Sequence, residues 1–157
     1  MKKRIIALGL LWCLSAVMLQ AARVDTVLVR SAAMNKDVKV VYVLPDKAIG
    51  KQACPVVYLL HGYGGNARSW VQLKPELPQM ADEKGIIFVC PDGKNSWYWD
   101  SPENPAYRYE TFVTSELVKY TDGNYATIPD RKARAISGLS MGGHGALWSA
   151  IRHKDVF

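Results

Sequence analysis

A serine between two glycines is the residue of this sequence best suited to chemistry. The segment 138–142 reads Gly-Leu-Ser-Met-Gly, with a predicted strand before it and a predicted helix after it. A sharp turn from strand to helix strains the backbone of the serine and directs its hydroxyl out of the sheet. Because larger side chains at Gly138 and Gly142 would collide in such a turn, both glycines fit it. Ser140 is therefore the predicted nucleophile, and the alternative is an ordinary serine in a glycine-rich turn.

A second glycine-rich turn, His-Gly-Tyr-Gly-Gly at 61–65, directly follows an apolar run at 56–60. In a doubly wound sheet, ligands bind at the carboxyl ends of the strands, where this turn and Ser140 would both lie. Acyl transfer needs two hydrogen-bond donors aimed at the oxyanion that develops on the substrate. The backbone N–H groups of Tyr63 and Met141 are the natural pair. The alternative is a tight turn that binds no ligand.

The segments around these turns predict the elements that position them. Alternating or β-branched runs at 24–29 and 38–43 predict two strands that could pair antiparallel at a sheet edge. Apolar runs predict further strands at 56–60, 86–90 and 133–137, and helical spacing is found near 75–83, 109–120 and 142–152. Strands that alternate with helices predict an α/β fold, with a mostly parallel, doubly wound sheet covered on both faces.

Six ordered segments give the sequence a family resemblance that extends from about Val24 to its end. They are His61-Gly-Tyr-Gly-Gly, Pro91-Asp-Gly, Trp97-Tyr-Trp-Asp-Ser, Tyr109-Glu-Thr, Glu116-Leu and Gly138-Leu-Ser-Met-Gly-Gly. The set resembles the esterase D / feruloyl-esterase-like branch of the α/β-hydrolases, which includes S-formylglutathione hydrolases and mycolyltransferases of the antigen 85 type. The resemblance implies an α/β-hydrolase fold and hydrolysis of carboxylic esters. It also implies Ser140 as nucleophile and Tyr63 and Met141 as oxyanion donors.

The sequence departs from the family on the C-terminal side of Ser140. The family's catalytic residues run in the order serine, acid, histidine along the chain, whereas this sequence ends at Phe157. His144 and His153 lie on the helix behind the serine, and His61 belongs to the oxyanion turn. We therefore expect 23–157 to be the N-terminal part of an esterase domain, with the C-terminal part of the fold missing. We expect this part alone to be inactive.

The N-terminus has the layout of a secretory signal peptide. Lys2, Lys3 and Arg4 precede an uncharged apolar run at 5–19, and small residues follow up to Ala22. We expect 1–22 to be cleaved, leaving a secreted or periplasmic protein with no stable membrane span, because the run is short for one. An uncleaved anchor is the alternative. Without three of its 20 basic residues the chain keeps 17 against 14 acidic ones, a net of +3, and no basic cluster predicts nucleic-acid binding.

Two cysteines, Cys54 and Cys90, remain after that cleavage. They would lie at opposite ends of parallel neighbouring strands, roughly 16 Å apart for a five-residue strand. A disulfide needs Cα atoms within about 7 Å, so we predict two free thiols. No group of His, Cys and carboxylates has metal-ligand spacing, and we expect neither metal nor cofactor.

Aromatic residues in a long loop at about 91–105 offer the best indication of a substrate. Trp97 and Trp99 could stack on a sugar or a phenolic acyl group, with Asp100 facing the cleft, or they could form a lid packed on the core. The exported context favours a feruloyl or acetyl ester on plant polysaccharide, with a small-molecule or polysaccharide-linked ester as the partner. The alternatives are an acyltransferase or peptidase on the same fold, or an inactive fragment.

Overall fold

Five strands form one sheet in the computed structural model, which describes residues 22–157. The strands are β1 (Arg23–Ser31), β2 (Lys36–Leu44), β3 (Val56–Leu60), β4 (Ile87–Pro91) and β5 (Arg134–Gly138). Their spatial order is β1-β2-β4-β3-β5. The β1/β2 and β2/β4 pairs are antiparallel, and β3 is parallel to both β4 and β5. The antiparallel edge pair and the parallel centre are therefore confirmed, while the predicted signal peptide at 1–22 lies outside the described residues apart from Ala22.

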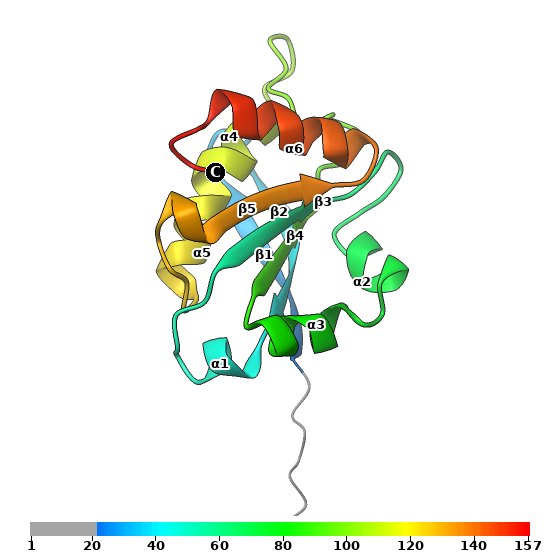
Figure 1. Cartoon of the computed structure of the whole chain (residues 1–157). Coiled ribbons are helices and arrows are strands. Elements are labelled where there is room, and N and C mark those ends of the chain that lie inside the picture. The colour runs from blue at the N-terminus through cyan, green and yellow to red at the C-terminus, as the bar shows by residue number, and fades with distance from the viewer. Residues whose placement is uncertain (1–21) are drawn as a thin grey trace, which may run out of the picture.

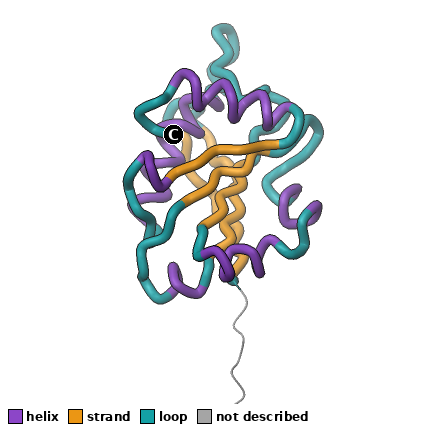
Figure 2. The backbone as a smooth tube through the Cα atoms, viewed as in Figure 1, coloured by secondary structure: helices purple, strands orange, loops and turns teal. Residues whose placement is uncertain are grey.

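Helices cover both faces of this sheet, as Figures 1 and 2 show. The helices are α1 (Asp46–Ile49), α2 (Ser69–Leu73), α3 (Leu77–Lys84), α4 (Tyr109–Thr111), α5 (Leu117–Asn124) and α6 (Met141–Arg152). One buried cluster joins the sheet to α4, α5 and α6, and a second joins its other face to α2 and α3. Side chains of β2 alternate between the two clusters, with Tyr42 in the first and Val43 in the second. Both faces of the central strands are therefore buried.

The helices differ in detail from the sequence prediction. The stripe predicted at 109–120 is not one regular helix, because a π-helical segment, Phe112–Glu116, separates α4 from α5. The helix predicted near 75–83 begins at Leu77, and the short helix α2 precedes it. Among residues 22–157 no helix is long and apolar enough to cross a membrane.

Cys54 and Cys90 are both buried free thiols, as predicted. Cys54 lies before β3 and pairs with Thr127 in an isolated parallel β-bridge of the backbone, whereas Cys90 lies within β4 near its carboxyl end. Burial raises the pKa of the Cys90 thiol to about 12. This thiol is therefore protonated at neutral pH and contributes to the core as a small apolar side chain.

Candidate active site

Ser140 lies at a strained turn between β5 and α6. The strand ends at Gly138 and the helix begins at Met141, so the predicted change from strand to helix is confirmed. Ser140 has φ 54° and ψ −116°, a conformation that a non-glycine residue adopts at a cost of about 1–3 kcal/mol. The side chain is exposed. Backbone strain at an exposed serine is the geometry of a nucleophile elbow.

Close backbone contacts explain why glycines flank this turn. A Cβ atom at Gly138 would lie 2.2 Å from the carbonyl carbon of Gly142. A Cβ atom at Gly142 would lie 2.2 Å from the carbonyl oxygen of Leu60, the last residue of β3. The elbow therefore rests on the end of the neighbouring strand, with no room for a side chain at either position.

The turn after β3, residues 61–65, lies against the turn that carries Ser140. A Cβ atom at Gly62 would lie 3.6 Å from the Cβ atom of Ser140, so the two turns are in contact. Within residues 22–157, the N–H groups of Tyr63 and Met141 donate to no protein acceptor. The Met141 N–H also belongs to the first turn of a 12-residue helix, whose N-terminus favours negative charge. Both predicted oxyanion donors are thus free to bind a ligand.

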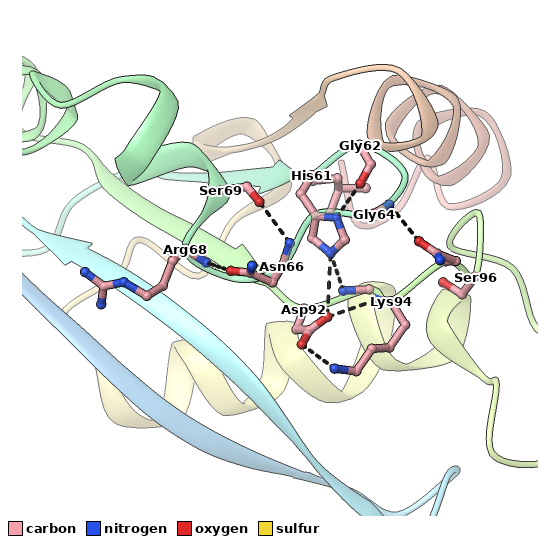
Figure 3. A network of polar contacts seen from close by, with 12 residues as sticks. His61, Gly62, Gly64, Asn66, Arg68, Ser69, Asp92, Lys94 and Ser96 are labelled. Atoms are coloured by element: carbon pink, nitrogen blue, oxygen red, sulfur yellow. Dashed lines mark hydrogen bonds and ion pairs between the residues drawn. The ribbon is translucent and has the colours of Figure 1, made fainter.

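His61 holds the start of this turn and is itself fully engaged (Figure 3). Its Nε2 accepts the N–H of Gly93 at 2.9 Å, so the ring proton is on Nδ1, which donates to the carbonyl of Gly62 at 2.7 Å. The side chain is 1% exposed. His61 therefore has a structural hydrogen-bonding role, and neither ring nitrogen is available to take a proton from Ser140.

Asp92 and Asn95 support the turn from the loop after β4. Lys94 binds the Asp92 carboxylate through both its Nζ, at 2.8 Å, and its backbone N–H, at 3.0 Å. Burial alone would raise the pKa of Asp92, but these and neighbouring hydrogen bonds outweigh it and hold the pKa well below the usual range. Asn95 accepts the N–H of Gly64 at 2.8 Å. Asn95 and the N–H of Gly93, which donates to His61, therefore fix the turn to the loop at two points.

Tyr98 is the most important residue that the sequence reasoning missed. Its hydroxyl accepts the N–H of His61 at 3.0 Å and donates to the His61 carbonyl at 3.3 Å. Its ring is fully buried, and it fills the space where Cβ atoms at Gly93 and Gly145 would stand, only 2.3 and 2.6 Å from ring atoms. One side chain thus joins the turn after β3, the loop after β4 and helix α6.

Comparison with known proteins identifies the family of this chain. A model of the Esterase family matches residues 31–157. The chain belongs to the Esterase family. This confirms the predicted resemblance.

Three similar proteins illustrate the range of the family. An acetyl esterase of Caldicellulosiruptor saccharolyticus is 28% identical over 135 residues, which cover 81% of this chain and 50% of the relative. A diacylglycerol acyltransferase/mycolyltransferase of Mycobacterium gordonae is 33% identical over 144 residues, 85% of this chain and 40% of the relative. The solved structure of a ferulic acid esterase has a TM-score of 0.75 and 31% identity, over 87% of this chain and 58% of that one. These likenesses confirm the α/β-hydrolase fold, and the chain spans about half or less of the length of the curated relatives it matches.

In this Esterase-family chain, two tryptophans of the loop after β4 are exposed beside α6. Trp97 is 44% and Trp99 47% exposed, and their ring centroids lie 5.5 and 5.2 Å from that of His144. Trp97 and Tyr98 both have positive φ, 55° and 58°, and the Tyr98 ring between the two tryptophans is fully buried. The loop therefore combines a buried tyrosine with two exposed tryptophans, and substrate binding by Trp97 and Trp99 stays a prediction.

Asp100 ties its loop to α4 and lines a cleft. Its carboxylate accepts the N–H of Thr111 at 3.0 Å and the hydroxyl of the same residue at 2.5 Å, which ties the loop to α4. It also lines a cleft of about 510 Å³. Asp100 is therefore a loop-fixing residue at the edge of a cleft.

The remaining two histidines of this Esterase-family chain lie on or just after α6, with different surroundings. His153 contacts Glu110 at 2.9 Å, and Glu110 accepts two further hydrogen bonds, from Trp148 at 2.9 Å and Arg152 at 2.8 Å. His144 packs among Trp97, Trp99 and Trp148, and its buried Nδ1 has no partner. Within residues 22–157, no histidine is hydrogen-bonded to the hydroxyl of Ser140.

Proposed function

We propose that this chain carries the nucleophile and the oxyanion donors of a serine carboxylic-ester hydrolase. Ser140 attacks the ester carbonyl, and the N–H groups of Tyr63 and Met141 bind the oxygen that becomes negatively charged. The strained conformation of Ser140, held by glycines against the end of β3, is the observation that carries the proposal. The chain's membership of the Esterase family supports it.

The reaction proceeds in two steps. The hydroxyl oxygen of Ser140 forms a bond to the carbonyl carbon while its proton passes to a base, and collapse of the tetrahedral intermediate expels the alcohol, which takes up a proton. Water then attacks the acyl-enzyme and releases the acid. Because no histidine among residues 22–157 is hydrogen-bonded to the Ser140 hydroxyl, we propose that the base is a group outside these residues. The 157-residue chain alone is then expected to be inactive.

The proposed substrate is a feruloyl or acetyl ester of plant polysaccharide, met outside the cytoplasm after removal of 1–22. The exposed rings of Trp97 and Trp99, which pack against His144 of α6, suit a sugar or phenolic group, and Asp100 lines a nearby cleft. The names of the acetyl esterase and ferulic acid esterase relatives agree with this choice. Acyl transfer to an alcohol instead of water is the second candidate, favoured by the mycolyltransferase relative.

The test compares the 157-residue chain with the product of its complete gene, each with and without Ser140→Ala. We expect the complete protein to hydrolyse p-nitrophenyl acetate and Ser140→Ala to lower kcat by about 10³-fold or more. We expect the 157-residue chain to give no rate above its own Ser140→Ala control. A Ser140-dependent rate from the short chain would show that its base lies within these residues. Product analysis with added alcohols then separates hydrolysis from acyl transfer.

A further inference from the structure

The carbonyl oxygen of Leu60, the last residue of β3, accepts hydrogen bonds from two distant parts of the chain. One donor is the backbone N–H of Leu139, directly before Ser140, at 3.2 Å. The other is the indole Nε1–H of Trp70, at 3.0 Å. A carbonyl oxygen has two lone pairs, so both bonds can form together. One backbone atom is therefore shared by the elbow and by the side chain of Trp70.

The peptide group that joins Leu60 to His61 is held at both of its ends. Its carbonyl accepts the two bonds just described, and its N–H donates to the hydroxyl of Tyr98 at 3.0 Å. A peptide group is planar, so bonds to its oxygen and to its N–H together fix the orientation of the whole unit. The segment that leads to Tyr63 therefore leaves β3 in one fixed direction.

The proposed oxyanion donor lies two peptide groups further on. The N–H of Tyr63 shares a planar peptide group with the carbonyl of Gly62. That carbonyl accepts from Nδ1 of His61 at 2.7 Å and from the N–H of Gly65 at 3.0 Å. These two bonds lie within the turn, so they orient the donor relative to the turn but not relative to Ser140. The peptide group at the end of β3 supplies the second relation, because it is bonded to the elbow.

Trp70 belongs to α2, which follows the oxyanion turn in the chain and packs against it. The hydroxyl of Ser69, the first residue of α2, accepts the N–H of Asn66 at 2.8 Å. A Cβ atom at Gly65 would lie 2.8 Å from the same hydroxyl oxygen, so the turn and the helix are in contact. The Trp70 ring is half-buried against the second apolar cluster, between the sheet and α3. Packing of this ring therefore sets where its indole N–H lies.

We infer that Trp70 is a positioning residue for the proposed ester hydrolysis. Through the Leu60 carbonyl, its indole N–H fixes the separation between Ser140 and the N–H of Tyr63. The inference rests on the proposed function and adds to it a residue that acts through another group. Without the indole bond, the carbonyl keeps only the longer bond from Leu139, and the peptide group at the end of β3 is held less firmly. Misplacement of a catalytic group by about 1 Å can lower a rate about 10²-fold, so a smaller displacement is measurable in kcat.

Two substitutions of Trp70 in the complete protein separate the hydrogen bond from the packing of the ring. Trp70→Phe keeps an aromatic ring without an N–H, whereas Trp70→His is smaller and can place its Nε2–H where the indole Nε1–H lies. We expect Trp70→Phe to lower kcat for p-nitrophenyl acetate about tenfold with KM little changed, because the oxyanion forms only as the reaction proceeds. Trp70→His should keep a kcat at least about threefold above that of Trp70→Phe. A role in packing alone predicts the reverse order, since histidine fills less space.

Trp148→Phe is the matched control, because it removes an indole N–H that bonds to Glu110, at 2.9 Å, near the other end of α6. Its kcat should equal that of wild type. Rates are compared at a temperature at which circular dichroism shows each variant to be folded. NMR spectra of the backbone amides give a readout that needs no turnover. Trp70→Phe should shift the amide resonance of Tyr63, Trp70→His should return it toward its wild-type position, and Trp148→Phe should leave it unchanged.

The outcomes separate this inference from the proposed function. An unchanged Tyr63 resonance in Trp70→Phe, or a kcat for this variant that equals that of wild type or exceeds that of Trp70→His, overturns the inference. If Trp70→Phe does not fold, a shifted Tyr63 resonance together with a tenfold loss of kcat in folded Trp70→His overturns it, and wild-type values support it. A complete protein without Ser140-dependent hydrolysis refutes the proposed function, and the Tyr63 resonance then still decides whether Trp70 holds the turn.

Discussion

The Tyr98 side chain joins three parts of the site, and replacing it by phenylalanine removes only its hydroxyl. The ring stays, so the contacts at Gly93 and Gly145 are kept, and only the two hydrogen bonds to His61 are lost. Both backbone groups of His61 are buried, and neither has another partner within residues 22–157. The substitution therefore leaves a buried N–H and a buried carbonyl unpaired.

The size of the effect can be worked out from that loss. A buried donor without a partner costs about 1–3 kcal/mol, and the longer bond to the carbonyl adds less. A loss of about 2 kcal/mol in the free energy of unfolding lowers Tm by about 6–8 °C for a domain of this size. His61 also holds Gly62, next to the proposed oxyanion donor Tyr63. We therefore expect kcat of the complete protein to fall about tenfold with KM little changed, because an oxyanion donor acts mainly on the transition state.

Thermal denaturation of the 157-residue chain and steady-state kinetics of the complete protein measure the two effects. Tyr107→Phe makes the same chemical change at a half-buried tyrosine whose hydroxyl has no hydrogen bond among the described residues, and it serves as the control. If Tyr98→Phe matches this control in both Tm and kcat, Tyr98 does not position the turn. A fall in Tm with unchanged kcat would limit its role to stability.

Two further substitutions test the elbow and the buried carboxylate. Gly142→Ala should cost about 3 kcal/mol or more in unfolding free energy, since its Cβ would lie 2.2 Å from a backbone oxygen, whereas Gly123→Ala, in open space on α5, should stabilise by about 0.5–1 kcal/mol. Equal urea midpoints for the two would contradict the close contact. Because hydrogen bonds lower the pKa of Glu110, its contribution to stability is complete above the unfolded pKa of about 4.3 and is lost as pH falls through the folded pKa. On acidification to below about pH 4, the unfolding free energy of Glu110→Gln should therefore fall less than that of wild type. Parallel curves of unfolding free energy against pH for the two proteins would refute this.

Local features of this chain could be predicted from its sequence, whereas long-range pairings could not. The elbow spans five residues, and the need for glycine at 138 and 142 arises from sterics within it. Strand positions are indicated by apolar runs of four to six residues. The order β2-β4-β3-β5 depends on how the connections cross the sheet, and no periodicity encodes that. The prediction therefore included the parallel centre but not the antiparallel pairing of β2 with β4.

The burial and the contacts of Tyr98 and Glu110 could not be predicted from the sequence. Tyr98 lies between two exposed tryptophans in a loop without regular period, and its partners come from distant parts of the sequence. Alternation of side chains gives no signal here, because Trp97 and Tyr98 have positive φ and the segment is not extended. Glu110 carries no sign of burial in the sequence. It is buried because its partners come from α6, 38 to 43 residues away in the sequence.

The contacts of Tyr98 decide which parts of this site can change independently. Gly93 and Gly145 lack side chains because the Tyr98 ring occupies that space, so the loop after β4 cannot move away from α6 without leaving a cavity. The same side chain binds His61, so such movement would also release the turn that carries Tyr63. Trp97 and Trp99 face outward on either side of it, with no comparable constraint. Under the proposed function, substrate preference can therefore vary through these two residues while the position of the proposed oxyanion donors stays fixed.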